Sequence, residues 1–228
     1  MRRAVREALD ELHALADPSR LEGMARYAIP ADLGVTIYEL RPLAKRLGSD
    51  HELALGLWGS GIHEARILAG FVDDPALITE EQMEDWVADF DSWDLCDQVC
   101  GLFEQTAFAW KKAREWSRRG EEFVKRAAFA IVAGLAVHDK AAGDGAFVRF
   151  LPTIRRGAAD DRNFVKKAVS WALRNIGKRN LALNAAALET ADDLRGSASR
   201  SARWVGSDAA RELASERVQK RLRRKARG

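Results

Sequence analysis

The segment 92–105 places an aromatic ring and a carboxylate one helical turn apart. Trp93 and Asp97, at positions i and i+4 of a predicted helix, lie together beside its apolar face. A ring next to a carboxylate near a helix start, at the edge of a core, suits the floor of a small site. The same spacing also fits a core tryptophan with a solvated carboxylate that the helix dipole favours. Apolar residues of this helix are Leu95, Cys96, Val99, Leu102 and Phe103.

Arg126 is a second residue that could do chemistry. It lies near Phe123 on a predicted helix that is otherwise small and apolar on that side. We expect its guanidinium to be partly buried and to need a partner. Asp97 and a phosphate are two candidates, and an arginine that reaches solvent from the helix edge is the alternative.

The segment 161–179 carries the strongest local pattern. One face of the predicted helix is fully apolar, and a second stripe combines aromatic and basic residues at i, i+3, i+7 and i+10. Such a stripe suits phosphate contacts together with stacking on bases. A helix packed on both sides would use the same aromatic residues, so the pattern leaves both interpretations open. The stripe consists of Phe164, Lys167, Trp171 and Arg174.

Charge is divided unevenly along the chain. Residues 1–100 hold 9 Lys and Arg against 20 Asp and Glu, a net charge of −11, whereas residues 101–228 hold 28 against 14, a net charge of +14. This asymmetry is typical of a surface that binds a polyanion, with an acidic protein partner or plain solvation of helix faces as alternatives. The end of the chain, 216–227, adds seven basic residues that fit either a phosphate backbone or a solvated terminus.

Several classes of protein are excluded. Cys96 and Cys100 lie one helical turn apart, which argues against a disulfide framework and for two core-lining thiols in a reducing compartment. The longest apolar stretch, 129–137, is too short to span a membrane, and the charged N-terminus does not resemble a signal segment. No metal-ligand pattern, phosphate-binding glycine loop or nucleophile elbow occurs. We therefore expect a cytoplasmic protein with no metal, no cofactor and no membrane contact.

Helices must position these residues. Only five prolines occur, apolar residues make up 47% of the chain, and helical periodicity runs from end to end. We predict an all-α, HEAT-like solenoid of stacked antiparallel helix pairs with a concave basic surface, formed as a single domain over 1–228; a globular bundle is the competing shape. Thr79 with Gln82 forms a capping-box pattern, and Ser92, Asp160 and Ser199 are predicted N-caps. Predicted helices cover 2–16, 20–29, 36–47, 51–57, 61–71, 80–90, 92–105, 108–118, 121–138, 145–157, 161–176, 178–195, 199–213 and 215–225.

The sequence resembles the bacterial DNA alkylation-repair glycosylases of the AlkD type. Matching pieces follow the family's order along nearly the whole chain, and the ordered set is more specific than any one piece. They are Met24–Tyr27, Leu33–Val35 with Leu40–Arg41, Leu57–Trp58 with Glu64–Arg66, Ser92–Asp94 with Asp97, Arg126–Ala127, and Phe164–Ala168 with Ser170–Arg174.

This resemblance implies a metal-independent, monofunctional enzyme that excises cationic N3-alkyladenine and N7-alkylguanine from duplex DNA, as a monomer. It implies that Asp97 is the catalytic carboxylate, which stabilises the positive charge developing on the deoxyribose and positions a water. Trp93 and Trp171 match the two tryptophans beside the lesion, and Arg126 matches an arginine that holds the DNA backbone near Asp97. DNA-binding residues expected on this basis and from the basic stripe are Tyr27, Phe164, Lys166, Lys167, Arg174, Lys178 and Arg179.

The chain departs from the family at Asn163, where a second aromatic residue can stand, and this puts lesion range and affinity in question. Two other functions stay open. A non-catalytic helical-repeat module that binds branched or distorted DNA would not need an aromatic-lined carboxylate. A protein-binding scaffold would not show the steep salt dependence of phosphate contacts.

Overall fold

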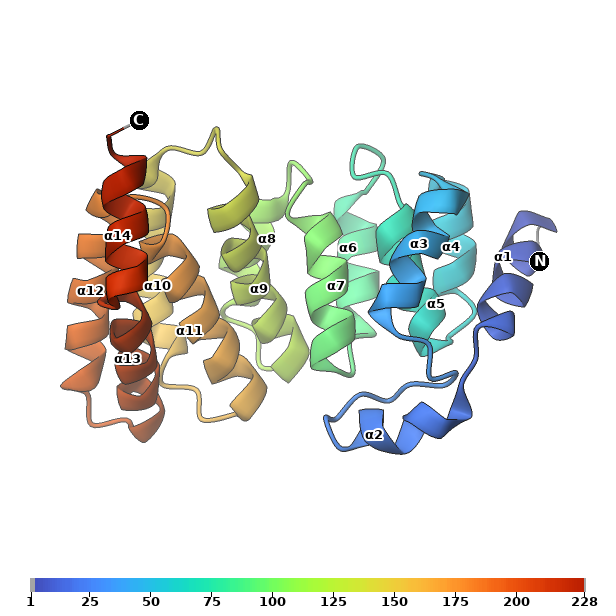
Figure 1. Ribbon diagram of the computed structural model, residues 1–228, viewed down its shortest axis with the longest axis horizontal. Helices are drawn as coiled ribbons and strands as arrows, with labels where there is room; N and C mark the ends of the chain where they lie inside the picture. Colours follow the sequence, from blue (N-terminus) through green and yellow to red (C-terminus); the bar gives the residue numbers. More distant parts are fainter. Residues whose placement is uncertain (1–2, 228) are drawn as a thin grey trace. The chain divides into compact units, whose positions relative to one another are not determined.

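Every regular element in residues 3–227, which the computed structural model describes, is a helix. Fourteen α-helices and one short 3-10 helix follow one another through this part of the chain, with no strand (Figure 1). This confirms the all-α fold class. The helices belong to two compact units, 1–108 and 109–228.

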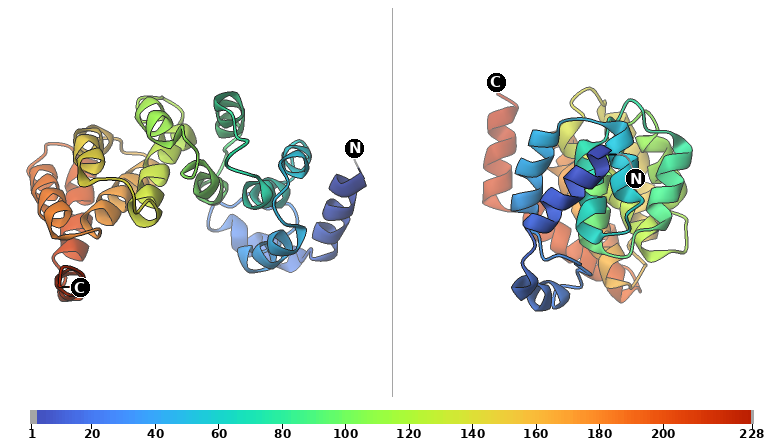
Figure 2. Two further views of the ribbon diagram at one scale, coloured as in Figure 1. Left: turned by 90° about the horizontal axis from the view of Figure 1, so that it is seen from above. Right: turned by 90° about the vertical axis from the view of Figure 1, so that its right-hand side faces the viewer.

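The first unit packs around α5 and α7. Its helix α5 contacts α3, α4 and α7, while α1 packs on α4. Figure 1 shows α3 to α7 running side by side, and the left panel of Figure 2 shows them end-on. The elements are α1 (Arg3–Ala14), η1 (Pro18–Arg20), α2 (Leu21–Ala25), α3 (Ile37–Leu47), α4 (His51–Trp58), α5 (His63–Val72), α6 (Glu80–Ala88) and α7 (Trp93–Phe103).

The second unit is built on the pairing of α9 with α11, its most extensive helix–helix interface. Helix α11 also packs against α10, α12 and α13. It is therefore enclosed on more than one side. The elements are α8 (Ala109–Trp116), α9 (Glu122–His138), α10 (Asp144–Gly157), α11 (Asn163–Gly177), α12 (Leu181–Arg195), α13 (Arg200–Leu213) and α14 (Glu216–Lys225).

The predicted N-cap positions are confirmed at Thr79, Ser92 and Ser199 and wrong at Asp160. The Thr79 and Ser199 side chains accept hydrogen bonds from backbone N–H groups three residues on, although the Gln82 amide donates to Asp73 instead of completing a capping box. Ser92 occupies the N-cap position of α7, but its buried hydroxyl has no hydrogen-bond partner in the described chain. Asp160 does not cap α11, whose N-cap is Arg162, because its carboxylate binds basic side chains.

The predicted helix over 20–29 is shorter in the structure. Helix α2 ends at Ala25, and the chain then turns through Ala28, which has a left-handed backbone with φ of 57°. A left-handed alanine is uncommon and marks a constrained turn. Pro30 follows two residues later and cannot donate a helical hydrogen bond, so the helix cannot continue.

No helix of the described residues is long and apolar enough to cross a membrane. Cys96 and Cys100 are buried and unbridged, as expected for core-lining thiols. Burial raises the pKa of the Cys100 thiol well above its ordinary value, so it stays protonated.

Candidate functional site

The start of α7 presents the predicted aromatic–carboxylate pair. Trp93 is the first residue of the helix, and Asp97 follows one turn later; both side chains are half-buried. The apolar face of the same helix is buried, with Leu95 and Val99 fully enclosed. The carboxylate therefore lies at the border between core and surface, where a ligand can approach it.

Trp93 is anchored by a segment far away in the sequence. Its indole Nε1 donates a hydrogen bond to the backbone carbonyl of Tyr27 at 2.7 Å. The left-handed φ of Ala28 helps set the orientation of the peptide group that carries this carbonyl. Tyr27 is 73% exposed, so two predicted site residues are joined through a backbone atom while the tyrosine side chain stays accessible.

A buried carboxylate holds the segment that follows Tyr27. Glu64 on α5 is 1% exposed, and its Oε1 accepts hydrogen bonds from the backbone N–H groups of Leu33 at 2.9 Å and Gly34 at 2.8 Å. Its Oε2 accepts a further one from Asp32 at 3.1 Å. Three charge-assisted bonds at one buried side chain fix this turn against α5. Sequence reasoning missed this role, although an acidic residue in an apolar helix was the signal for it.

A second buried contact supports the first turn of α7. His63 Nε2 lies 2.9 Å from Asp94 Oδ2, and both residues are buried. Burial alone lowers the pKa of His63, but the Asp94 hydrogen bond and the charges of Asp94, Glu64 and Asp91 outweigh it, so the pKa is raised. The pair ties α5 to the residue next to Trp93. The sequence offered no spacing that predicted it.

In the second unit, Arg126 is buried, as predicted, and its guanidinium is hydrogen-bonded within the protein. Arg126 is 6% exposed, and its Nη1 donates to the backbone carbonyl of Phe164 at 2.6 Å. The Phe123 and Phe164 rings pack beside this contact, with centroids 5.6 Å apart. Arg126 thus fastens α9 to the first turn of α11, where the predicted DNA-binding residues begin.

The turn before α11 is held by another ion-pair group. Asp160 accepts hydrogen bonds from Arg162 Nη2 at 2.6 Å and from Lys125 Nζ at 3.0 Å. The Arg162 hydrogen bond is the main cause that lowers the pKa of Asp160 to about 2, against the opposing effect of burial, and Lys125 adds to it. The start of α11 is therefore tied to α9 by side chains as well as by packing.

The basic stripe of α11 divides in two. Lys167 is exposed and has no ion pair with any described residue, and Trp171 is half-buried without a ring partner in the described chain. Lys166 is half-buried, with its Nζ 5.6 Å from the Trp204 ring centroid. Arg174, by contrast, binds across to α13, where its Nη1 lies 2.6 Å from Glu212 Oε2. The stripe is thus partly an accessible surface and partly a helix–helix contact.

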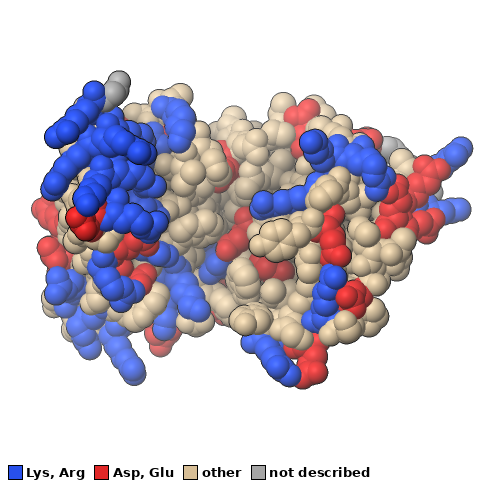
Figure 3. Space-filling view, viewed as in Figure 1, with Lys and Arg blue, Asp and Glu red and all other residues tan. Residues whose placement is uncertain are grey.

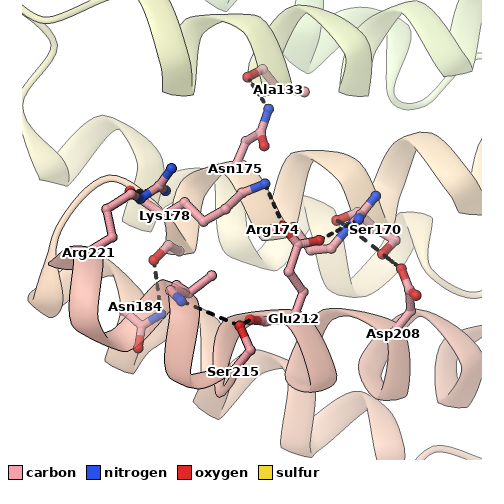
Figure 4. Close-up of polar contacts among 12 residues, drawn as sticks. Ala133, Ser170, Arg174, Asn175, Lys178, Asn184, Asp208, Glu212, Ser215 and Arg221 are labelled. Carbon is pink, nitrogen blue, oxygen red and sulfur yellow. Dashed lines mark hydrogen bonds and ion pairs between the residues drawn. The ribbon is translucent and has the colours of Figure 1, made fainter.

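The remaining predicted cations also have partners within the unit. Lys178 binds Glu212 at 2.9 Å, and Figure 4 shows Lys178 and Arg174 converging on this carboxylate. Burial raises the pKa of Glu212, but the hydrogen bonds from Lys178 and Arg174 outweigh it and lower the pKa. Arg179 donates to the carbonyls of Ala136, Asp139 and Ala142 at 2.8 to 3.1 Å and packs on the Phe147 ring. Any DNA contacts that we propose for Arg174, Lys178 and Arg179 must form alongside these contacts within the protein.

The predicted residues fall into two groups, one in each unit, and the structure joins Trp93 to Tyr27 in the first and Arg126 to Phe164 in the second. Trp93, Asp97 and Tyr27 belong to the first; the others belong to the second and are Arg126, Phe164, Lys166, Lys167, Trp171, Arg174, Lys178 and Arg179. Across the described residues, no group of three or more His, Cys, Asp or Glu side chains could hold a metal ion.

The fold is that of a helical-repeat protein. Residues 8–213 match the DNA alkylation repair enzyme family, and the chain belongs to that family. A solved structure is similar to this chain with a TM-score of 0.79 and 19% sequence identity. The similarity covers 96% of this chain and 95% of the other. That protein is described as one of a new family related to the HEAT-like repeat DNA glycosylases, with affinity for branched DNA structures. No curated protein matches the sequence significantly.

Proposed function

We propose that the chain is a monofunctional, metal-independent DNA glycosylase that removes cationic alkylated purines, such as N3-alkyladenine and N7-alkylguanine, from duplex DNA. The observation that carries this proposal is the half-buried Asp97 one helical turn from Trp93, whose ring is anchored to the Tyr27 carbonyl. A pure DNA-binding module has no need of this arrangement. Membership of the alkylation repair family supports the same function.

The chemistry suits a carboxylate without a general acid. An alkylated purine already carries a positive charge, so it is a good leaving group once the glycosidic bond breaks. The remaining requirement is to stabilise the cationic deoxyribose of the transition state and to place a water for attack. Asp97 would supply the negative charge, and the face of Trp93 would favour the cationic nucleotide.

The predicted residues of the second unit would hold the substrate. Lys167 is the most accessible cation of the α11 stripe and would neutralise a backbone phosphate, while Trp171 offers a ring face to the nucleotide. Arg126 would act from its fixed position under Phe164. Because this guanidinium is already hydrogen-bonded, it would not have to be ordered when DNA binds.

The test is release of N7-methylguanine from methylated duplex DNA, with EDTA present throughout. We expect release by the wild type and a loss on the order of 10²-fold in Asp97→Asn, because one charge is removed from the transition state. Asp85→Asn, an exposed carboxylate on α6 of the same unit, is the matched control and should retain activity. Absence of base release by the wild type would refute the proposal that the protein is a glycosylase. Equal base release by Asp97→Asn and Asp85→Asn would refute the proposal that Asp97 is the catalytic group.

A second candidate function is binding of branched DNA without catalysis. It is favoured by the similarity to a structure described as having affinity for such DNA. This function predicts preferential binding of a four-way junction over a linear duplex, no base release, and the same junction affinity for the wild type and Asp97→Asn. Base release by the wild type that depends on Asp97 would decide against it.

A further inference from the structure

The basic C-terminal helix α14 is a packed element of the second unit. Val218 and Leu222 are buried, with exposures of 3% and 1%. Gln219 Nε2 donates to Asn184 Oδ1 at 2.9 Å and to the Leu213 carbonyl at 2.8 Å. These contacts hold one face of the helix against the unit, so the other face is presented in a defined orientation.

The outward face of α14 is almost uniformly positive. Over Glu216–Lys225 six cations accompany one carboxylate, a net charge of +5. Figure 3 shows Lys and Arg side chains crowding over the part of the molecule where Figure 1 places α14. None of the large exposed hydrophobic side chains of the described chain lies on this helix. The exposed cations are Arg217, Lys220, Arg221, Arg223, Arg224 and Lys225.

This arrangement does not stabilise the helix by itself. Arg217 and Arg221, and likewise Lys220 and Arg224, are like-charged pairs at i and i+4 that oppose helix formation, and the Glu216–Lys220 ion pair offsets this only in the first turn. The positive charges near the C-terminus gain some energy from the helix dipole, but that favours the last turn only. A polyanion would remove the repulsion along the whole helix.

The positive surface continues into a cleft between α14, the end of α9 and the start of α12. The cleft has a volume of about 700 Å³, and its lining includes five cations and the carboxylate of Asp144. Arg221 donates to the Lys178 carbonyl at 3.3 Å and Lys225 to the Arg179 carbonyl at 2.9 Å. Carbonyl partners satisfy hydrogen bonds but cancel no charge, whereas Lys178 is paired with the Glu212 carboxylate. The five cations are Lys140, Lys178, Arg179, Arg221 and Lys225.

We propose that the outer face of α14 and this cleft together bind the phosphodiester backbone of DNA, independently of any damaged base. Arg221 and Lys225 belong to both parts and make the surface continuous. A ten-residue helix is about 15 Å long, which matches the axial rise of about four base pairs of a duplex at ~3.4 Å each. An acidic protein would be expected to meet an apolar interface core; α14 exposes no large apolar side chain, and the cleft adds Val137 and Leu181 among its cations.

The test is binding of undamaged duplex DNA, measured by fluorescence anisotropy over a range of salt concentrations. In the variant Arg217→Gln, Lys220→Gln, Arg223→Gln, Arg224→Gln, we expect weaker binding by at least about tenfold at low salt. The slope of log K against log salt should fall by about 0.9 for each phosphate that is no longer neutralised. Lys140→Gln tests the cleft alone and should lower the slope by about 0.9, the effect of a single phosphate. Thermal unfolding checks that both variants remain folded.

The matched control removes four cations from exposed positions of the first unit: Arg3→Gln, Arg6→Gln, Arg41→Gln, Lys45→Gln. The control should keep most of the wild-type slope. An equal loss in both fourfold variants would show that only net charge matters and would overturn the proposal, as would an unchanged slope in the α14 variant. Stronger binding of polyglutamate than of duplex DNA would also overturn it. Because undamaged DNA is the probe, the result does not depend on glycosylase activity.

Discussion

Trp93 donates its indole N–H to the backbone carbonyl of Tyr27 at 2.7 Å. Both residues were predicted for the same site, from parts of the sequence 66 residues apart. The hydrogen bond uses a main-chain atom of Tyr27, so the rings of both residues stay available as aromatic surfaces. It fixes the ring beside Asp97 before any ligand arrives.

This contact predicts separate roles for the two aromatic residues. Trp93→Phe keeps a ring but loses the donor, and it leaves a carbonyl without its partner. We expect a loss of about 0.5–1.5 kcal/mol in the free energy of unfolding, and a drop in base release at saturating protein. Tyr27→Phe is the control, because it retains the carbonyl and should keep wild-type stability in the same chemical denaturation. Unchanged stability in Trp93→Phe would contradict the structural role of the bond.

The buried Glu64 carboxylate predicts a stability effect. Glu64→Gln replaces one accepting oxygen with an amide donor, which faces backbone N–H groups of the segment 32–34. We expect the free energy of unfolding to fall by about 1–3 kcal/mol. Glu81→Gln on α6, an exposed site, should change it by less than about 0.5 kcal/mol. Equal effects of the two substitutions in urea denaturation would show that the network contributes nothing.

His63 predicts a pH dependence of stability. Its pKa is raised in the folded state by Asp94 and neighbouring carboxylates despite burial. The stabilisation is therefore fully present below the unfolded pKa of about 6.5 and is lost as pH rises through the higher folded pKa. We expect the free energy of unfolding to decrease over this range, measured by urea denaturation at successive pH values. His63→Gln should flatten that decrease, whereas His13→Gln, at an exposed position, should leave it in place.

Lys167 and Arg174 share a helix but should respond differently to substitution by alanine. Lys167→Ala removes an exposed charge, so we expect weaker DNA binding, a salt slope lower by about 0.9, and little change in stability. Arg174→Ala leaves Glu212 with one cation fewer and should lower the free energy of unfolding by about 1 kcal/mol. Anisotropy titrations and denaturation curves on both variants separate the two effects. A loss of stability in Lys167→Ala with none in Arg174→Ala would show that Lys167 is the packed residue and Arg174 the accessible one.

Much of the fold followed from the sequence because helices are encoded locally. Apolar periodicity and the caps at Thr79 and Ser199 depend on residues within a few positions of each other, and the helices occur close to the predicted ranges. The shortened α2 is the exception, and Pro30 with the left-handed Ala28 accounts for it. Burial of Cys96, Cys100 and Arg126 was predictable for the same local reason, the composition of their helix faces.

The partners of the charged residues were decided by tertiary structure alone. The spacing of Arg174 and Lys178 marks a basic helix face, but it cannot tell whether that face meets solvent or Glu212 on a neighbouring helix. Likewise, an acidic residue in an apolar helix signals that Glu64 is buried, but nothing local to Glu64 or His63 identifies the backbone turn or the aspartate that each one binds. A side chain's type and helical position follow from nearby residues, whereas its hydrogen-bond partners here come from segments some 30 to 40 residues away. Sequence therefore identified Trp93, Asp97 and Lys167 as candidates, and packing decided which other predicted cations are already engaged within the protein.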